Sequence, residues 1–514
     1  MKLGVSCVVL VIGLLTDASE RVQAEVKLPN VIGSNMVLQR DRELPIWGQA
    51  DPGEKVTVTI AGQSVSGEAD AKGLWSVKLA KLQAEGPHDM TVKGKNEITL
   101  TNILVGEVWL GSGQSNMQWS VQQSVNAAEE IKTATSPKMR LFLVPLVPSG
   151  TPTADVNARW VECSPETIPG FSAVLYFFGR EIQQQVKVPV GLIATSWGGT
   201  KIEPWIPPAG YAAVPELKSE LEGLNSTLKT YNQQLKTAIP ALKDWVAKAE
   251  TAYAAGRNVP PIPLVPNHPL NSSGAATGLY NGMIHGVVPF GMRGVLWYQG
   301  ESNRGQRMHY FDLKKGLISG WRQVWAQGDF PFLFVQLAPF NYGNDPSHEL
   351  AHIWEAQRAT LQVPNTGMAV TTDISTLNDI HPPNKQEVGR RLALWALAQT
   401  YGQQDLIYSG PLYESMSDDL DGLAIKFKHG AGLKSRDGRP LSWFTIAGAD
   451  KKFHPATAEI NGDTVSVLSP NVSKPVAVRF GWNQLAEPNL VNRAGLPASP
   501  FRTDTWSDAI PASP

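Results

Sequence analysis

A chain of 514 residues is too long for one compact domain and has enough sequence for two or three hydrophobic cores. Its formal net charge of -1 excludes the strongly basic composition of proteins that bind nucleic acid or an anionic membrane surface. Its sixteen tryptophans offer aromatic faces on which sugar rings can stack, although most tryptophans of a protein lie in its cores.

The first 24 residues have the pattern of a cleaved signal peptide. Lys2 precedes an apolar run from Gly4 to Leu15, and Val22-Gln23-Ala24 is a small-residue cleavage site. The run is too short to span a bilayer. We therefore expect an exported protein, periplasmic or secreted, with no membrane partner. Cleavage removes Cys7 and leaves Cys163 without a partner for a disulfide, so we expect Cys163 to be a packed residue.

Residues 25–105 contain short runs of alternating polar and apolar residues, such as Val56 to Ile60 and Trp75 to Leu79, separated by glycine-containing turns. This pattern predicts an antiparallel β-sandwich segment. The same pattern returns in residues 403–514, for example from Leu423 to Phe427. We expect these two β-sandwich or jelly-roll regions to flank the middle of the chain and to pair with each other.

Residues 106–402 alternate strand-like segments with amphipathic helical ones, such as Phe171 to Val186. This alternation predicts an α/β domain with a doubly wound parallel sheet. In such a sheet, functional loops follow the carboxyl ends of the strands. The candidate strands are Glu107 to Gly111, Met139 to Val144, Val190 to Thr195, Gly294 to Tyr298, Phe332 to Leu337 and Gly367 to Thr372.

One insertion, at about residues 209–258, interrupts this alternation. Its helical pattern, with Pro240 near the middle, predicts a helical hairpin, and a proline-rich loop from Val259 to Pro269 follows. The insertion carries no cluster of acids, bases or metal ligands, so we expect a structural or rim role for it.

Polar motifs follow four of the predicted strands. A serine nucleophile needs a base, an orienting acid and donors for the oxyanion, and one edge of the sheet can supply all of them. Any single motif is explained as well by a helix cap or a turn, but their joint placement predicts a serine hydrolase. The motifs are Ser115, Ser196-Trp197-Gly198-Gly199, Gln299-Gly300-Glu301-Ser302-Asn303 and Asp379-Ile380-His381.

These motifs resemble those of the sialate O-acetylesterase family of the SGNH (GDSL-like) hydrolases. The resemblance covers nearly the whole mature chain. It implies an SGNH-type doubly wound sheet in a flavodoxin-like three-layer arrangement, and a serine esterase that removes O-acetyl groups from carbohydrates through an acetyl-enzyme, without metal or cofactor. The motifs are Gly113-Gln114-Ser115-Asn116-Met117, Ser196 to Thr200, Leu279 to Ile284, Trp297 to Asn303, Asp379 to Pro382, Asn35 to Arg40 and Phe501-Arg502-Thr503.

The resemblance also implies roles for individual residues. Ser115 is the expected nucleophile and His381 the expected general base. The expected oxyanion donors are the backbone amides of Ser115 and of Gly198 or Gly199, together with the side chain of Gln299. The wider superfamily has an asparagine where this chain has Gln299.

The triad acid departs from the superfamily pattern as well. The superfamily places an aspartate three residues before the histidine, where this chain has Asn378, so we expect Asp379 to be the acid, with Asp373 as the alternative. Asn303 is the alternative side-chain donor to the oxyanion. The residues expected to contact the substrate are Gln114, Asn116, Trp197, Glu301 and Asn303.

The substrate is expected to be an acetylated plant cell-wall glycan, xyloglucan or xylan, because export and abundant tryptophan suit neutral sugars. The alternative is a sialate 9-O-acetylesterase. A sialate carboxylate would need a cation, and Lys201, Arg304 and Arg307 lie close to the motifs. The run from Phe480 to Leu490 either reaches over the pocket to the sugar or only stabilises the C-terminal region.

Two other classes compete with the esterase. A non-catalytic carbohydrate-binding protein would use the tryptophans but would not depend on His381. A lipase or peptidase is disfavoured, because the Gly-x-Ser-x-Gly motif of α/β-hydrolases is missing around Ser115.

Overall fold

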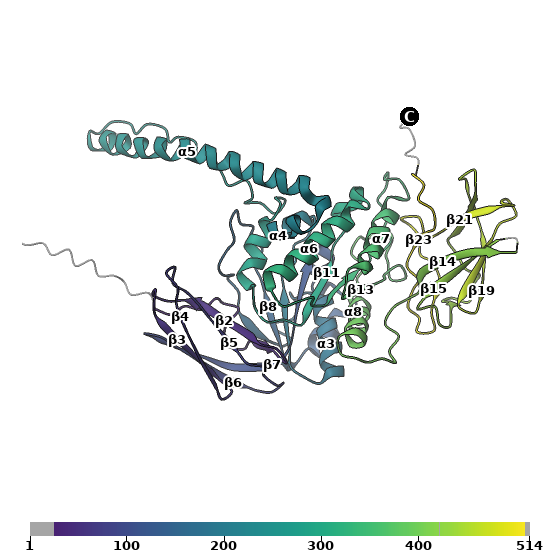
Figure 1. The fold of residues 1–514 in the computed structure, drawn as a ribbon, viewed down its shortest axis with the longest axis horizontal. Helices are drawn as coiled ribbons and strands as arrows, with labels where there is room; N and C mark the ends of the chain where they lie inside the picture. The colour runs from purple at the N-terminus through teal and green to yellow at the C-terminus, as the bar shows by residue number, and fades with distance from the viewer. Residues whose placement is uncertain (1–24, 421, 509–514) are drawn as a thin grey trace, which may run out of the picture.

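The computed structural model describes residues 25–420 and 422–508, so the predicted signal peptide lies outside the described residues. A central sheet in the order β13-β12-β11-β7-β10-β8-β9 forms the middle of the molecule (Figure 1). Its first six strands are parallel, and β9 is an antiparallel edge strand. The strands are β7 (Glu97–Gly113), β8 (Ser136–Leu143), β9 (Trp160–Cys163), β10 (Val190–Ala194), β11 (Gly294–Tyr298), β12 (Phe332–Val335) and β13 (Thr366–Ala369).

Helices cover both faces of this sheet. Gly111 of β7 packs against Leu175 of α3, whereas Trp297, on the opposite face of the neighbouring strand, packs against Trp321 of α6. Every residue of β10 and β11 is buried, as expected of parallel strands covered on both sides. The predicted parallel α/β sheet is therefore confirmed. The helices are α1 (Ser115–Gln118), α2 (Ala127–Lys132), α3 (Ala173–Val186), α4 (Pro208–Ala213), α5 (Lys218–Ala254), α6 (His309–Trp325), α7 (Glu349–Ala359) and α8 (Lys385–Gln399).

The N-terminal β region runs directly into the central sheet. The first half of β7 pairs with β6 and β1, and its second half lies between β10 and β11. The boundary expected near residue 105 therefore falls inside one continuous strand. The other strands of this region are β1 (Val37–Gln39), β2 (Leu44–Gln49), β3 (Lys55–Ile60), β4 (Gln63–Glu68), β5 (Leu74–Leu79) and β6 (His88–Lys93).

The C-terminal β region has a hydrophobic core of its own, which includes Ile425, Val465 and Phe480. Its sheets have the orders β14-β15-β20-β19 and β18-β17-β21-β23, and β16 pairs with β22. Its strands are β14 (Leu412–Asp419), β15 (Gly422–Lys428), β16 (Lys434–Ser435), β17 (Phe444–Gly448), β18 (Phe453–Pro455), β19 (Thr457–Asn461), β20 (Thr464–Leu468), β21 (Pro475–Phe480), β22 (Leu490–Val491) and β23 (Phe501–Arg502).

The predicted pairing of the two β regions is wrong. They lie at opposite ends of the α/β domain (Figure 1), and among the described strands no N-terminal strand pairs with a C-terminal one. The reason is the position of β7, which ties the N-terminal region to the middle of the sheet. The C-terminal region instead docks beside β12, where Ser499 bonds Gln336, and on α7, where Arg502 pairs with Glu355.

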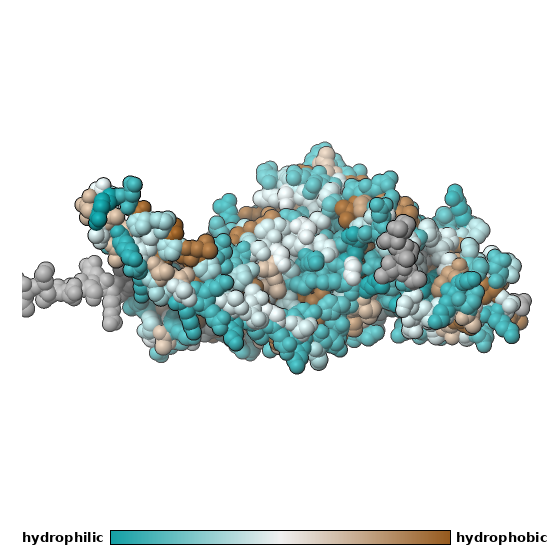
Figure 2. All heavy atoms as spheres, turned by 90° about the horizontal axis from the view of Figure 1, so that it is seen from above, coloured by the Kyte–Doolittle hydropathy of each residue, from teal (hydrophilic) through white to brown (hydrophobic). Residues whose placement is uncertain are grey.

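The predicted helical hairpin is also wrong. α5 is a single helix of 37 residues that continues through Pro240 and projects from the body as an arm (Figure 1). Residues 257–269 return along it without forming a helix, because they contain five prolines, which remove backbone donors. Trp245 Nε1 donates to the Pro260 carbonyl at 2.8 Å and ties the two together. Hydrophobic surface stays exposed on the arm (Figure 2). Leu264, in the returning segment, is 91% exposed.

Within residues 25–420 and 422–508, no helix is long and apolar enough to cross a membrane. Cys163 is buried, as predicted, and burial raises the pKa of its thiol to about 12. Its thiol is therefore a packed group and not a nucleophile.

Candidate active site

Ser115 stands where the central strand β7 gives way to a short helix. It is the first residue of α1 and is half-buried. The turn before it depends on Gly113, whose φ is +139°, and a Cβ there would lie 2.1 Å from the carbonyl oxygen of Tyr298. Only glycine lets β7 and β11 approach this closely while the chain turns. The serine is therefore held at the carboxyl edge of the sheet, as predicted.

Gly198 packs directly against the serine. A Cβ built on Gly198 would lie 3.3 Å from the Cβ of Ser115. The backbone amide of Gly198 donates to Oε1 of Gln118 at 2.7 Å, so an oxyanion at this amide would replace the Gln118 side chain. Gly199 has φ +74° and open space around its Cα. Of the predicted glycine donors, the structure brings Gly198 into contact with Ser115.

The loop that carries His381 docks on the serine helix. The imidazole stacks on Trp119, with ring centroids 4.6 Å apart and planes 16° from parallel. Asn116 Nδ2 donates to the carbonyl of Ile380 at 3.0 Å. His381 Nδ1 lies 3.7 Å from Oδ1 of Asp379, which also accepts the His381 backbone amide at 2.9 Å. His381 Nε2 is buried, with no hydrogen-bond partner among the described residues.

The surroundings of His381 favour its neutral, basic form. Burial lowers the pKa of the imidazole below its usual 6.5, the charge of Lys385 lowers it further, and Asp379 partly opposes both. Asp373, the alternative acid, is buried in a two-pronged ion pair with Arg391, with distances of 2.6 and 2.7 Å. The structure therefore leaves Asp379 as the carboxylate beside the imidazole.

Behind the serine lies a buried polar chain that the sequence analysis missed in part. Lys385 Nζ donates to Asn116 Oδ1 at 2.5 Å, and Asn116 Nδ2 donates to Glu301 Oε1 at 2.6 Å. All three residues are at most 5% exposed. Burial lowers the pKa of Lys385 to about 7 and raises the pKa of Glu301. Asn116 and Glu301 are thus buried and hydrogen-bonded within the protein in this structure. They were expected to contact the substrate, but here they do not face an open site.

The position of Lys385 in the sequence already indicated an unusual environment. It is the first residue of α8, where the helix dipole disfavours a cation. It also lies on the buried face that includes Val388 and Leu392. A lysine on an apolar face at the wrong end of a helix indicates a specific partner, here the amide of Asn116.

The predicted side-chain donors to the oxyanion are engaged elsewhere. Gln299 is fully buried, and its Nε2 donates to Asn303 Oδ1 at 2.5 Å and to the Thr200 carbonyl at 3.3 Å. Asn303 Nδ2 donates to Gln306 at 2.6 Å and to a carboxylate at 3.0 Å. Both side-chain amide groups therefore donate to protein acceptors, and neither has an N–H free for an oxyanion in this structure. An oxyanion at either side chain would have to replace these acceptors, so the role expected of Gln299 or Asn303 stays a prediction.

Of the other expected substrate contacts, one stays accessible. Gln114 is buried, and its Oε1 accepts the backbone amides of Gly300 and Ser302 at 3.3 and 3.4 Å, so it braces the loop after β11. Trp197 remains partly exposed beside Gly198. It is the predicted contact that can still face a sugar.

The cations near the motifs differ in their availability. Arg304 pairs with Asp345 at 2.7 Å and Arg307 pairs with Glu349 at 2.8 Å. Lys201 is exposed, three residues beyond Gly198, and forms no hydrogen bond or ion pair with another described residue. It is the cation of the three that can meet a substrate charge.

The C-terminal run from Phe480 to Leu490 lies against loops that follow β12 and β13. The backbone amide of Phe340 donates to the Gln484 carbonyl at 3.0 Å, and the hydroxyl of Ser375 donates to Glu487 at 2.5 Å. The run therefore helps to shape this edge of the molecule.

Several known proteins resemble this chain over most of its length. A family model described as carbohydrate esterase, sialic acid-specific acetylesterase, matches residues 271–398. The sialate O-acetylesterase of Mus musculus is 30% identical over 503 residues, 89% of each chain, and that of Rattus norvegicus is 32% identical over 505 residues, also 89% of each chain. A solved carbohydrate acetylesterase from Xanthomonas citri is 36% identical, with a TM-score of 0.80, over 94% of this chain and 100% of that one.

Fold and sequence together define a carbohydrate O-acetylesterase, a carboxylic ester hydrolase, as predicted. The chain belongs to the sialate O-acetylesterase family. The expected preference for plant xyloglucan or xylan finds no support in these comparisons, and the sialate alternative fits the names of the relatives at least as well.

Proposed function

We propose that this enzyme removes O-acetyl groups from sialic acid, with Ser115 as nucleophile and His381 as general base in an SGNH-type site. The observation that carries the proposal is the docking of the histidine loop on the serine helix, through the Trp119 stack and the Asn116 hydrogen bond. This docking keeps His381 beside α1 with Nε2 unpartnered. We also propose export of the mature chain, as the sequence predicts.

The chemistry follows from these groups. Ser115 Oγ attacks the acetyl carbonyl while its proton passes to His381 Nε2, and the backbone amides of Ser115 and Gly198 receive the oxyanion. His381 then protonates the departing sugar oxygen, so that the sugar leaves as its free hydroxyl and the acetyl group stays on Ser115. Water, deprotonated by His381, attacks this ester, and His381 returns that proton to Ser115 Oγ as acetate leaves. Asp379 orients the imidazole and balances its charge.

Two observations support sialic acid over a neutral glycan. Nine of the sixteen tryptophans are buried, which removes most of the tryptophan argument for stacking neutral sugars. Lys201, exposed near the glycine turn, is suited to the carboxylate that sialic acid has and xylan lacks. The buried tryptophans are Trp75, Trp109, Trp160, Trp205, Trp297, Trp321, Trp325, Trp354 and Trp395.

The test is acetate release from 9-O-acetyl sialic acid and from acetylated xyloglucan and xylan oligosaccharides, measured in parallel. We expect the sialate to be preferred, and Ser115→Ala to lose about a millionfold in turnover. Lys201→Gln should lower kcat/KM for the sialate and leave the hydrolysis of p-nitrophenyl acetate unchanged. Preference for the plant oligosaccharides would refute the substrate, and turnover that survives Ser115→Ala would refute the mechanism.

A further inference from the structure

A second pocket, of about 600 Å³, lies between the α/β domain and the C-terminal β region. Its lining comes from α7 and α8 on one side and from β14, β15 and β23 on the other. Thr366, the first residue of the parallel strand β13, is part of the lining. The lining also includes Met308, which directly precedes α6, but Ser115 and His381 are not part of it.

Arg358 lines this pocket and has no salt bridge to another described residue. Its Nε is buried, and its guanidinium forms no hydrogen bond or ion pair within the part of the chain that the structure describes. The centroid of the Tyr413 ring is 5.9 Å from Cζ, and the charge of Glu355 acts on Arg358 without forming a salt bridge with it. Burial of Nε without an acceptor is costly, because this N–H donor loses its hydrogen bond to water. It lowers the pKa of Arg358 as well.

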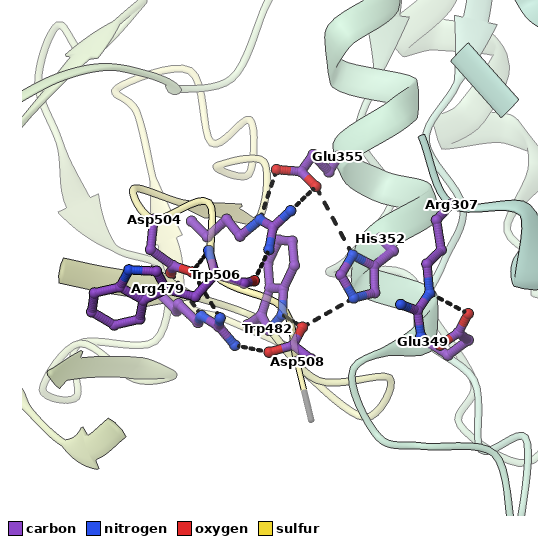
Figure 3. A network of polar contacts seen from close by, with 10 residues as sticks. Arg307, Glu349, His352, Glu355, Arg479, Trp482, Asp504, Trp506 and Asp508 are labelled. Carbon is purple, nitrogen blue, oxygen red and sulfur yellow. Dashed lines mark hydrogen bonds and ion pairs between the residues drawn. The ribbon is translucent and has the colours of Figure 1, made fainter. Parts of the chain in front are cut away.

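The nearby carboxylate does not serve Arg358. Glu355 accepts two hydrogen bonds from Arg502, both of 2.9 Å. Figure 3 shows Glu355 directed towards His352, and its Oε2 lies 4.0 Å from the imidazole. Lys428 also lines the pocket and has no ion-pair partner among the described residues. The lining thus holds three permanent cations and one carboxylate that is already paired.

We propose that this pocket is a second ligand site that binds the carboxylate of an acidic sugar. The fork of Arg358 matches the two oxygens of a carboxylate, and Lys428 adds a second charge. Tyr413 and Trp395 supply aromatic surface for a sugar ring. The identity of the sugar as sialic acid rests on the function proposed above. Acetate, the other product of that reaction, offers the same carboxylate, so the experiment must separate the two sources.

The experiment is isothermal titration of the full chain with N-acetylneuraminic acid, its methyl ester and acetate. We expect the free acid to bind, and Arg358→Met to weaken that binding about tenfold or more, the loss expected for charge-assisted hydrogen bonds. Arg358→Lys, which keeps the charge but loses the fork, should bind with intermediate affinity. Arg159→Met, which removes an exposed arginine, is the matched control and should bind like the wild type.

Each result of these titrations either supports the proposed site or overturns it. Weak binding of the ester supports a carboxylate site, and acetate that binds as tightly as the sugar acid would overturn the sugar assignment. Affinity that is unchanged in Arg358→Met, with an unfolding midpoint like that of the wild type, would overturn the site itself. Because binding is measured without hydrolysis, an inactive protein that still binds through Arg358 would refute the proposed function and leave this pocket standing.

Discussion

At the scale of single residues, burial and the charge of Lys385 together lower the pH at which His381 can act as a base. A lowered pKa means that the imidazole stays neutral, and able to accept a proton, below its usual 6.5. The acidic limb of the pH profile should therefore lie below pH 6.5. Burial is the larger cause, and the charge of Lys385 adds to it.

Lys385→Met should accordingly move the acidic limb of kcat/KM to higher pH and lower its plateau, because the charge and the bond to Asn116 are both lost. The measurement is a pH series of p-nitrophenyl acetate hydrolysis. Lys138→Met, at an exposed lysine, is the matched control. A plateau that falls without any shift of the limb would mean that Lys385 acts on His381 only through structure.

Some site residues were predictable from short motifs, and others were not. Ser115, Gly198 and His381 follow strands of a parallel sheet, so their meeting at one edge follows from the strand order. The bonds of Gln299 depend on Thr200 and Asn303, which reach it from two different loops. No pattern of spacing shows which acceptors an amide engages, so the sequence could not predict these hydrogen bonds of Gln299.

At the scale of elements, the arm is separable from the body. Of the 37 residues of α5, only Leu224 and Ala238 are buried. The rings of Tyr231 and His268 are 4.6 Å apart, so a short Gly-Ser link can join the two positions after residues 232–267 are removed. We expect this deletion to leave the main thermal unfolding midpoint and p-nitrophenyl acetate hydrolysis unchanged. Loss of either would show that the outer arm supports the catalytic domain.

The arm also shows where helix patterns mislead. A central proline is a usual helix end, and Pro240 suggested two helices. Strong helix formers, namely alanine, leucine, lysine, glutamate and glutamine, make up more than half of the helix on each side of Pro240, and they outweigh the loss of one hydrogen bond. The second half of the expected hairpin was in fact the end of one helix.

At the scale of the whole molecule, pH should control how firmly the C-terminal region docks on α7. His352 Nε2 lies 3.0 Å from Asp508 (Figure 3). Burial alone would lower the pKa of His352, but contacts with Asp508 and Glu355 outweigh it and raise the pKa above 6.5. Burial would raise the pKa of Asp508, but its contacts with His352, Arg479 and Trp482 hold it well below its usual range.

The directions of these two pKa shifts define the pH range in which the contact stabilises the folded protein. Because the pKa of His352 is raised, its protonation stabilises the folded state below pH 6.5, and this stabilisation is lost as the pH rises through the pKa of His352 in the folded protein. Because the pKa of Asp508 is lowered, its ionisation stabilises the folded state above pH 3.8. Thermal midpoints should therefore fall more between about pH 6 and pH 9 in the wild type than in His352→Gln. Equal slopes in the two proteins would contradict this role of His352.

The order of the large parts was only partly readable from the sequence. Alternating strands and helices predicted the parallel α/β sheet, because that periodicity is local. Whether two distant β regions pair depends on where their edge strands end. The sequence pattern does not encode that β7 continues unbroken from residue 97 to residue 113 and fixes the N-terminal region far from the C-terminal one.

The most direct test of the serine mechanism is to trap its covalent intermediate. Turnover of 9-O-acetyl sialic acid would be quenched with acid within the first cycles, and the protein digested and analysed by mass spectrometry. The mechanism predicts one acetyl group on the peptide that contains Ser115, absent from Ser115→Ala and enriched in His381→Ala mixed with an activated acetyl ester. Acetate release by the wild type without acetylation of that peptide, or with the acetyl group on another residue, would contradict it.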